Sequence, residues 1–310
     1  MRATPLSLAS FLISPCVFAG TSLSLESRFA VSFSPTTIIA SRFNTSVFIE
    51  LSTFLAPSKY ETYHRNIAHS YPAQSQDFDE VNVASIFQHA IRPVAESLTE
   101  QLGREPEYAS LFLPPIFDGR TQLAASDAIL RDAQYATRVG PSHNAVCFPY
   151  GFLEGKNLGR PLHECTEDGP ENLTFVLEYQ KDYFYAWLVV VAFELGTYPV
   201  MEQKICKDCG EGNREVRTYD LIRSPNKRED IRAIIIAGEV SKAAVAKLGN
   251  AVLKAVGTEE VRLLAEIDPS EVVAHGAAFW ARMTQRNPEA FVVHGGNKIP
   301  DEEDFDHSEL

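Results

Sequence analysis

Short runs of β-branched and aromatic residues alternate along the chain with segments whose apolar residues recur every three or four positions. The first pattern is typical of buried strands and the second of amphipathic helices. Predicted strands lie at residues 29–33, 37–40, 47–54, 111–113, 136–139, 173–179, 183–193, 198–204, 233–236 and 261–264. Predicted helices lie at residues 83–102, 123–134, 144–152, 242–256 and 269–283. Gly103 is expected to end the first helix and Pro93 to kink it.

The order of these elements occurs twice. Three adjacent strands followed by alternating strands and helices fill residues 21–153, and the same order returns, with a contracted middle, in residues 172–290. A polar stretch at residues 154–171 links the two halves. This order predicts an α/β protein built from two mixed sheets with helices packed on them and a cleft between the halves.

Composition and charge narrow the class of protein. The 310 residues are 45% hydrophobic and 22% charged, which is typical of a globular chain and argues against disorder. The formal net charge is -13. Because binding to nucleic acid depends on Lys and Arg side chains that displace counterions, an acidic chain without a basic stripe is not expected to bind it.

The two ends of the chain have their own patterns. Residues 1–20 combine a basic start at Arg2, an apolar run at residues 6–18 and small residues around Ala19, which predicts a secretory signal peptide. A buried N-terminal strand is the alternative. The apolar run is too short to cross a bilayer, so no membrane span is expected after the signal is removed. Residues 291–310 form an acidic tail.

The tail ends in His-Ser-Glu-Leu at residues 307–310, which resembles a retention signal of the endoplasmic reticulum lumen. The expected location is therefore the secretory pathway, either outside the cell or in that lumen. Asn44 and Asn172 begin glycosylation sequons. Cys206 and Cys209 are spaced to form a disulfide in an oxidising compartment, and a structural bond is favoured over thiol catalysis.

Several strings resemble the nucleotide-binding domain of the seventy-kilodalton heat-shock protein family and, more broadly, the actin-like ATPases. The most specific is IDPSEVVAHGAA at residues 267–278, which resembles the closing helix of that family. Residues 234–241 resemble its adenosine-binding strand and turn. The resemblance implies a two-lobed actin-like ATPase fold, which is a duplicated ribonuclease H-like fold, here with a contracted second lobe. It further implies ATP or ADP with magnesium as the ligand, at a site that includes Glu178, Ala237, Gly238, Glu239 and Gly276.

The sequence departs from this family where phosphate should bind. The first phosphate loop falls at residues 31–37, which contain no glycine and no acid, although Ser34, Thr36 and Thr37 carry hydroxyl groups. The second phosphate loop keeps Glu178 but continues with bulky residues in place of glycines. No acid stands at residues 141–143, where a group that orients water is expected. Losing these groups should remove most of the catalysis of phosphoryl transfer.

Three functions follow from this sequence, in order of preference. The first is a pseudo-ATPase of heat-shock-protein type that acts as a binding or scaffold module for a protein partner. The second is a protein that binds a nucleotide or another small ligand in the cleft, with weak or no hydrolysis. The third is an enzyme of another class that uses the cleft or the Cys206 and Cys209 pair.

Overall fold

The structure is a computed structural model that describes residues 29–44, 47–70, 79–129, 138–142, 145–152, 173–192, 196–206, 210–211, 231–257 and 261–286. The predicted signal peptide, the linker and the acidic tail lie outside these ranges. The strands are β1 (Phe29–Phe33), β2 (Thr37–Asn44), β3 (Val47–Leu55), β4 (Tyr108–Leu113), β5 (Arg138–Pro141), β6 (Leu173–Tyr179), β7 (Phe184–Ala192), β8 (Gly196–Cys206), β9 (Ile231–Ala237) and β10 (Arg262–Leu264). The helices are α1 (Ser58–Ser70), α2 (Glu80–Leu102), α3 (Gly119–Ile129), α4 (Lys242–Val256) and α5 (Val272–Arg286).

The strands form two five-stranded sheets with the same internal order. The first sheet runs β3-β2-β1-β4-β5 and the second runs β8-β7-β6-β9-β10. In each sheet the first three strands are antiparallel, and the last two lie parallel to the central strand, β1 or β6. The predicted α/β class, with two mixed sheets of repeated strand order, is therefore confirmed.

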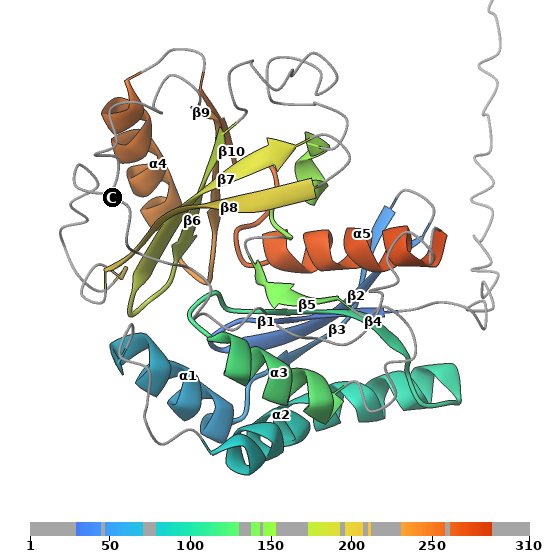
Figure 1. Cartoon of the computed structure of the whole chain (residues 1–310). Coiled ribbons are helices and arrows are strands. Elements are labelled where there is room, and N and C mark those ends of the chain that lie inside the picture. The colour runs from blue at the N-terminus through green and yellow to red at the C-terminus, as the bar shows by residue number, and fades with distance from the viewer. Residues whose placement is uncertain are drawn as a thin grey trace, which may run out of the picture.

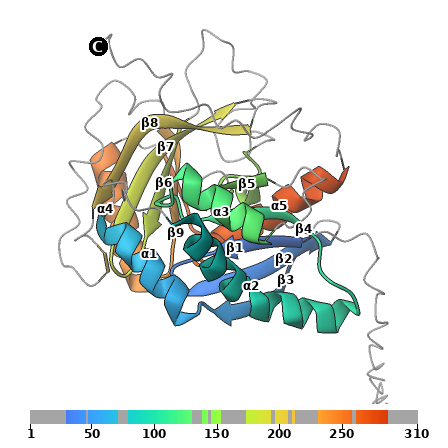
Figure 2. The same cartoon turned by 60° about the horizontal axis from the view of Figure 1, so that its bottom comes forward.

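The helices cover the sheets in layers (Figure 1). Helices α1, α2 and α3 lie on one face of the first sheet, and Figure 2 brings them forward. Helix α5, from the end of the described chain, lies on the opposite face against β1, β2 and β4. Helix α4 packs on the second sheet beside β9. The chain thus returns to its first sheet after completing the second.

The core follows the alternation of side chains along the central strands. In β9, Ile234 and Ile236 face one apolar cluster, which includes α4, whereas Ala233 and Ile235 face the other. The cluster that Ala233 and Ile235 face also contains Val31 from β1, so residues of both halves share one core. All seven residues of β6 are buried, as expected for a strand covered on both faces.

Two helices have caps at both ends, and Gly103 ends α2 as predicted, although α2 begins at Glu80 rather than at residue 83. The Asp79 carboxylate accepts the backbone N–H of Asn82 at the start of α2, and Gly103 ends the helix with φ 70°. Ser241 caps α4 in the same way, and Gly257 ends it. Helix α2 continues on both sides of Pro93.

One helix was missed and two predicted helices need correction. Helix α1 was not predicted, because its buried residues are Tyr60, His64 and Ala68, two of which carry polar groups that weaken the apolar pattern. The helix predicted at residues 144–152 is wrong: within the described residues 145–152, the helical element is a single 3-10 turn at Phe148–Tyr150, which ends at Gly151 with φ 70°. Helix α3 begins earlier than predicted, at Gly119, because the Asp118 carboxylate accepts the backbone N–H of Thr121.

Helix α5 lies very close to the chain beneath it. The Ser41 hydroxyl donates to the Ala274 carbonyl and the Ser110 hydroxyl donates to the Ala277 carbonyl, both at 3.0 Å. A Cβ at Gly276 would collide with the backbone carbonyl of Ala145. Only glycine therefore lets the helix approach this closely.

Gly276→Ala should lower the free energy of unfolding by about 2 kcal/mol, because a backbone carbonyl has little freedom to move away. Gly249→Ala is the matched control, since Gly249 also lies inside a helix but the nearest atoms to its Cβ would be side-chain methyl groups of Leu263 and Ile236 rather than backbone. The control should be neutral or slightly stabilising, because alanine favours a helix by about 1 kcal/mol over glycine. Urea denaturation measures both, and equal effects would contradict this account of the α5 contact.

Candidate functional site

A pocket of about 410 Å³ lies where the two halves meet. Its walls come from the turn between β1 and β2, from α1, from the turn between β6 and β7, and from the residue two positions after β9. The lining residues are Pro35, Thr36, Glu61, His64, Arg65, Ala68, Gln180, Lys181, Asp182, Tyr183 and Glu239. Two regions predicted as phosphate loops and the predicted adenosine turn therefore meet at this pocket.

The carboxylate of Glu239, from the second half, accepts hydrogen bonds from the first half at the pocket wall. Its Oε2 accepts the backbone N–H of Thr36 at 3.0 Å and the hydroxyl of Thr36 at 2.7 Å. Its Oε1 accepts the hydroxyl of Thr37 at 2.6 Å. Three donors of the first half thus converge on one carboxylate of the second half. Hydrogen bonds to a charged group are shorter and stronger than those between neutral groups.

The backbone around Glu239 places this side chain. Gly238 has φ 121°, which favours glycine, and a Cβ there would collide with the carbonyl of Tyr179. The Gly238 N–H donates to the Pro269 carbonyl at 3.0 Å. The Glu239 N–H donates to Oε1 of Gln180 at 2.9 Å. The turn after β9 is therefore held against the turn between β6 and β7.

Behind the pocket, the carboxylate of Glu178 collects three side-chain donors. The Tyr183 hydroxyl donates to Oε1 at 2.5 Å, and Nε2 of Gln180 donates to the same oxygen at 3.0 Å. The Ser142 hydroxyl of the first half donates to Oε2 at 3.4 Å. Glu178 is only 5% exposed, and such a carboxylate needs several donors. Gln180 links this carboxylate to Glu239 through its other amide atom.

Burial shifts the titration of two groups at this site. Removal from water raises the pKa of Glu178, although the hydrogen bonds from Tyr183, Gln180 and Ser142 act in the opposite direction. Burial lowers the pKa of His64 to about 3, with a smaller contribution from the positive charge of Arg65. Nε2 of His64 lies 3.4 Å from the hydroxyl of Tyr183. Because that hydroxyl donates to Glu178, its oxygen is free to accept from His64.

A buried hydroxyl beside these groups has no hydrogen bond within the described part of the chain. Tyr60 is fully buried, and its hydroxyl is unpaired there. Burial raises its pKa, and the charges of Glu239 and Glu178 raise that pKa further. The Tyr60 hydroxyl thus lies in the electrostatic field of both carboxylates.

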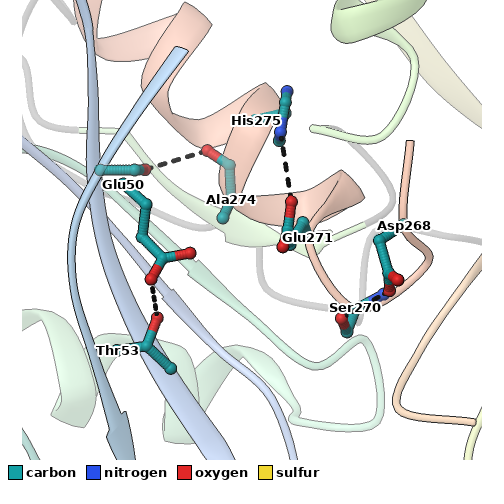
Figure 3. Close-up of polar contacts among 8 residues, drawn as sticks. Glu50, Thr53, Asp268, Ser270, Glu271, Ala274 and His275 are labelled. Carbon is teal, nitrogen blue, oxygen red and sulfur yellow. Dashed lines mark hydrogen bonds and ion pairs between the residues drawn. The ribbon is translucent and has the colours of Figure 1, made fainter. Parts of the chain in front are cut away.

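A second polar group lies at the start of α5 (Figure 3). The His275 ring stacks on Phe48 with centroids 3.6 Å apart, and Nε2 of His275 lies 3.7 Å from Glu271. Burial lowers the pKa of His275 to about 4. Glu50 bonds to Thr53, and Asp268 bonds to Ser270. The stacking of His275 on Phe48 attaches the helix start to β3, whereas the other contacts are local, and none of these residues lines the pocket between the halves.

The predicted site residues separate into two groups. Glu178, Gly238 and Glu239 lie together around Gln180, and Ala237 is the register partner of Glu178 in β9. Gly276 lies apart from them, against Ala145. Whether these residues bind a ligand stays a prediction. His64 was missed as a member of the site because α1 was missed, and the only sequence signal was its four-residue spacing from Tyr60 and Ala68.

Other predicted features fall partly outside the described residues. Asn172 and Cys209 lie outside them, so the glycosylation sites and the Cys206–Cys209 bond stay predictions. Asn44 ends β2. Cys147 is a buried free thiol whose pKa is raised by burial.

Across the described ranges, no group of three or more His, Cys, Asp or Glu residues is arranged to hold a metal ion. None of the helices described there is both long and apolar enough to cross a membrane.

Comparison of the sequence with protein-family models gives no match, and comparison with curated proteins also gives none.

The buried state of His64 predicts a specific loss of stability in acid. The pKa of about 3 in the folded protein lies below the ordinary 6.5, so between these values only the unfolded chain takes up the proton. The contribution is complete above pH 6.5 and is lost as the pH falls towards 3. His64→Gln should therefore reduce the slope of unfolding free energy against pH by up to about 1.4 kcal/mol per pH unit.

Urea denaturation over a series of pH values measures this slope. His89→Gln is the matched control, because His89 lies on the exposed side of α2. The control should keep the slope of the original protein. An unchanged slope in His64→Gln would mean that His64 is protonated in the folded protein.

Proposed function

We propose that the chain is a degenerate, two-lobed relative of the seventy-kilodalton heat-shock proteins and actin-like ATPases, and that it acts as a binding or scaffold module without hydrolysing ATP. Two observations support the framework. The two sheets have the same strand order, as a duplicated ribonuclease H-like fold requires. Helix α5, which contains most of the IDPSEVVAHGAA string, returns from the second half to pack on the first sheet. In this proposal the two sheets are the two lobes.

The contact between Glu239 and the turn after β1 is the main support for the proposed loss of ATPase activity. This turn is where the resemblance places the first phosphate loop. Three donors of this turn, the N–H of Thr36 and the hydroxyls of Thr36 and Thr37, already bond to the Glu239 carboxylate. Pro35, in the same turn, has no N–H to offer. A phosphate would have to displace a negative charge from its own donors.

The second turn supports the same conclusion. Gln180 and Tyr183 stand where glycines would let backbone N–H groups approach a phosphate. Both side chains are buried and bond to Glu178, so they fill that space. Ser142 stands where an acid that orients water is expected, and it donates its hydroxyl to Glu178. The residues present therefore do not fit the phosphates of ATP or a magnesium ion between them.

A second function is favoured by the pocket itself. A volume of about 410 Å³ is in the range of small-ligand sites, and polar and apolar groups both line it. In this second function the cleft binds a nucleotide or another small molecule, with weak or no ATP hydrolysis. An enzyme that uses the Cys206 and Cys209 pair is the third hypothesis, and it has no support beyond their spacing.

We also propose that the protein enters the secretory pathway, because the pattern of residues 1–20 is typical of a signal peptide.

Titration calorimetry with ATP and with ADP, each with and without magnesium, tests the proposed loss of nucleotide chemistry. We expect no saturable heat and no shift in melting temperature at millimolar nucleotide. A ligand at a hundred times its dissociation constant would stabilise the folded state by about 2.7 kcal/mol, which a melting curve resolves. A cooperative melt of the same sample is the control for folding. Saturable, magnesium-dependent heat would contradict the proposed misfit between the cleft and the phosphates of ATP, and it would favour the second function, a protein that binds a nucleotide in the cleft.

A further inference from the structure

We infer that the exposed face of α4 is a docking surface for an acidic peptide segment, and that residues 301–306 of the same chain are the segment that occupies it. The residues of this face do not line the pocket between the halves. Docking on α4 is therefore independent of what the pocket binds and of the proposed loss of ATPase activity.

Helix α4 presents one side to solvent. It packs on the face of the second sheet that is turned away from the core shared with the first half (Figure 1). Three lysines lie among its exposed residues, and the helix contains no Asp or Glu. The exposed residues, which form the lysine face, are Lys242, Ala243, Ala246, Lys247, Asn250 and Lys254.

The charges of the lysine face are not neutralised by the rest of the fold. No carboxylate in the described part of the chain lies within 4.0 Å of Lys242, Lys247 or Lys254. The Glu211 carboxylate bonds to Ser241, just before the helix begins. The whole chain has a formal net charge of -13, so this face differs in sign from the protein as a whole. A positive face attracts an acidic segment and repels a basic one.

The lysine face and the acidic segment match in length. Lys242 and Lys254 are twelve positions apart, which corresponds to about 18 Å along a helix. Residues 301–306 read DEEDFD, and six extended residues span about 20 Å. Ala243 and Ala246 lie between the lysines, and their short side chains let a peptide backbone approach the helix. An extended acidic segment can therefore place carboxylates beside all three lysines.

The chain that connects α5 to the acidic segment is long enough for this contact. Helix α5 begins soon after β10 of the second sheet and ends at Arg286, after about 22 Å. Residues 287–300 follow, and these fourteen residues span up to about 46 Å when extended. The tail can therefore return along α5 to the second sheet. A tethered segment acts at an effective concentration of about millimolar, so exposed charge pairs suffice to hold it.

Carbodiimide cross-linking of the full chain tests this docking, because the reagent joins a lysine amine to a carboxylate that touches it. Mass spectrometry measures the links between residues 301–306 and each lysine, relative to the rate at which that lysine is acetylated. Lys59 and Lys181 are the controls, since both are exposed on other elements. At low salt the lysines of α4 should form about five times as many links as the controls. In salt of about 1 M, where the screening length is about 3 Å, this difference should disappear.

Lys247→Glu combined with Lys254→Glu distinguishes docking from chance contact, since Lys242 keeps its amine. The links from Lys242 to the acidic segment should fall by more than half, because the reversed charges repel that segment. Lys59→Glu combined with Lys181→Glu is the matched control, which changes the net charge by the same amount and should leave these links unchanged. All four side chains are exposed, and a cooperative melt of each variant confirms that it folds.

A mixture of isotopically labelled and unlabelled chains identifies which copy supplies the segment. Links within chains of one label agree with docking of the chain on itself. Links between labelled and unlabelled chains would mean that the tail docks on a second copy, which contradicts the inferred occupant. Equal links at all exposed lysines, no links to α4, or unchanged Lys242 links in the double variant would overturn the lysine face as a docking surface.

Discussion

The contact on which the site depends is an anion held by donors from another part of the same chain. Glu239 lies about two hundred positions after Thr36 and Thr37, and the fold brings them together at hydrogen-bond distance. Glu239 is half-buried, and the threonine turn supplies three of the hydrogen bonds that its carboxylate would otherwise make to water. Because Gly238 and Gln180 hold the backbone of Glu239, the carboxylate is directed at that turn rather than at solvent.

This contact does not hold the two halves together. Hydrogen bonds to a charged group contribute about 1.5 to 3 kcal/mol when well made, and less where a partner is exposed, as Thr36 is. Burying one large apolar side chain contributes about 1.5 to 3 kcal/mol. The shared core contains many such side chains from both halves, among them Phe33, Phe117, Tyr183 and Trp187. Helix α5 forms a further, separate apolar cluster with β1 and β4. The packing therefore joins the halves, and Glu239 determines how the turn at the pocket is occupied.

The elements with a strong local pattern could be predicted from the sequence. In β9, residues 233–237 are a continuous apolar run, and α4 has a serine before its first residue and a glycine after its last. The repeated order of strands followed from such elements and is observed in both sheets. Helix α1 was missed because tyrosine and histidine form much of its buried face. The predicted cluster of Glu178, Gly238 and Glu239 is brought together, but its bonding to Thr36 and Thr37 depends on tertiary structure and has no local pattern.

A double-mutant cycle between Thr37 and Glu239 tests the central claim most directly. Thr37→Val removes the donor and Glu239→Gln removes the charge, each with little change of shape. We expect a coupling energy of about 1 kcal/mol in the free energy of unfolding, because the two side chains share one charged hydrogen bond. Thr53→Val combined with Glu239→Gln is the control and should be additive, since Thr53 bonds to Glu50. Additive effects in the Thr37 cycle would contradict a site that the protein fills with its own carboxylate.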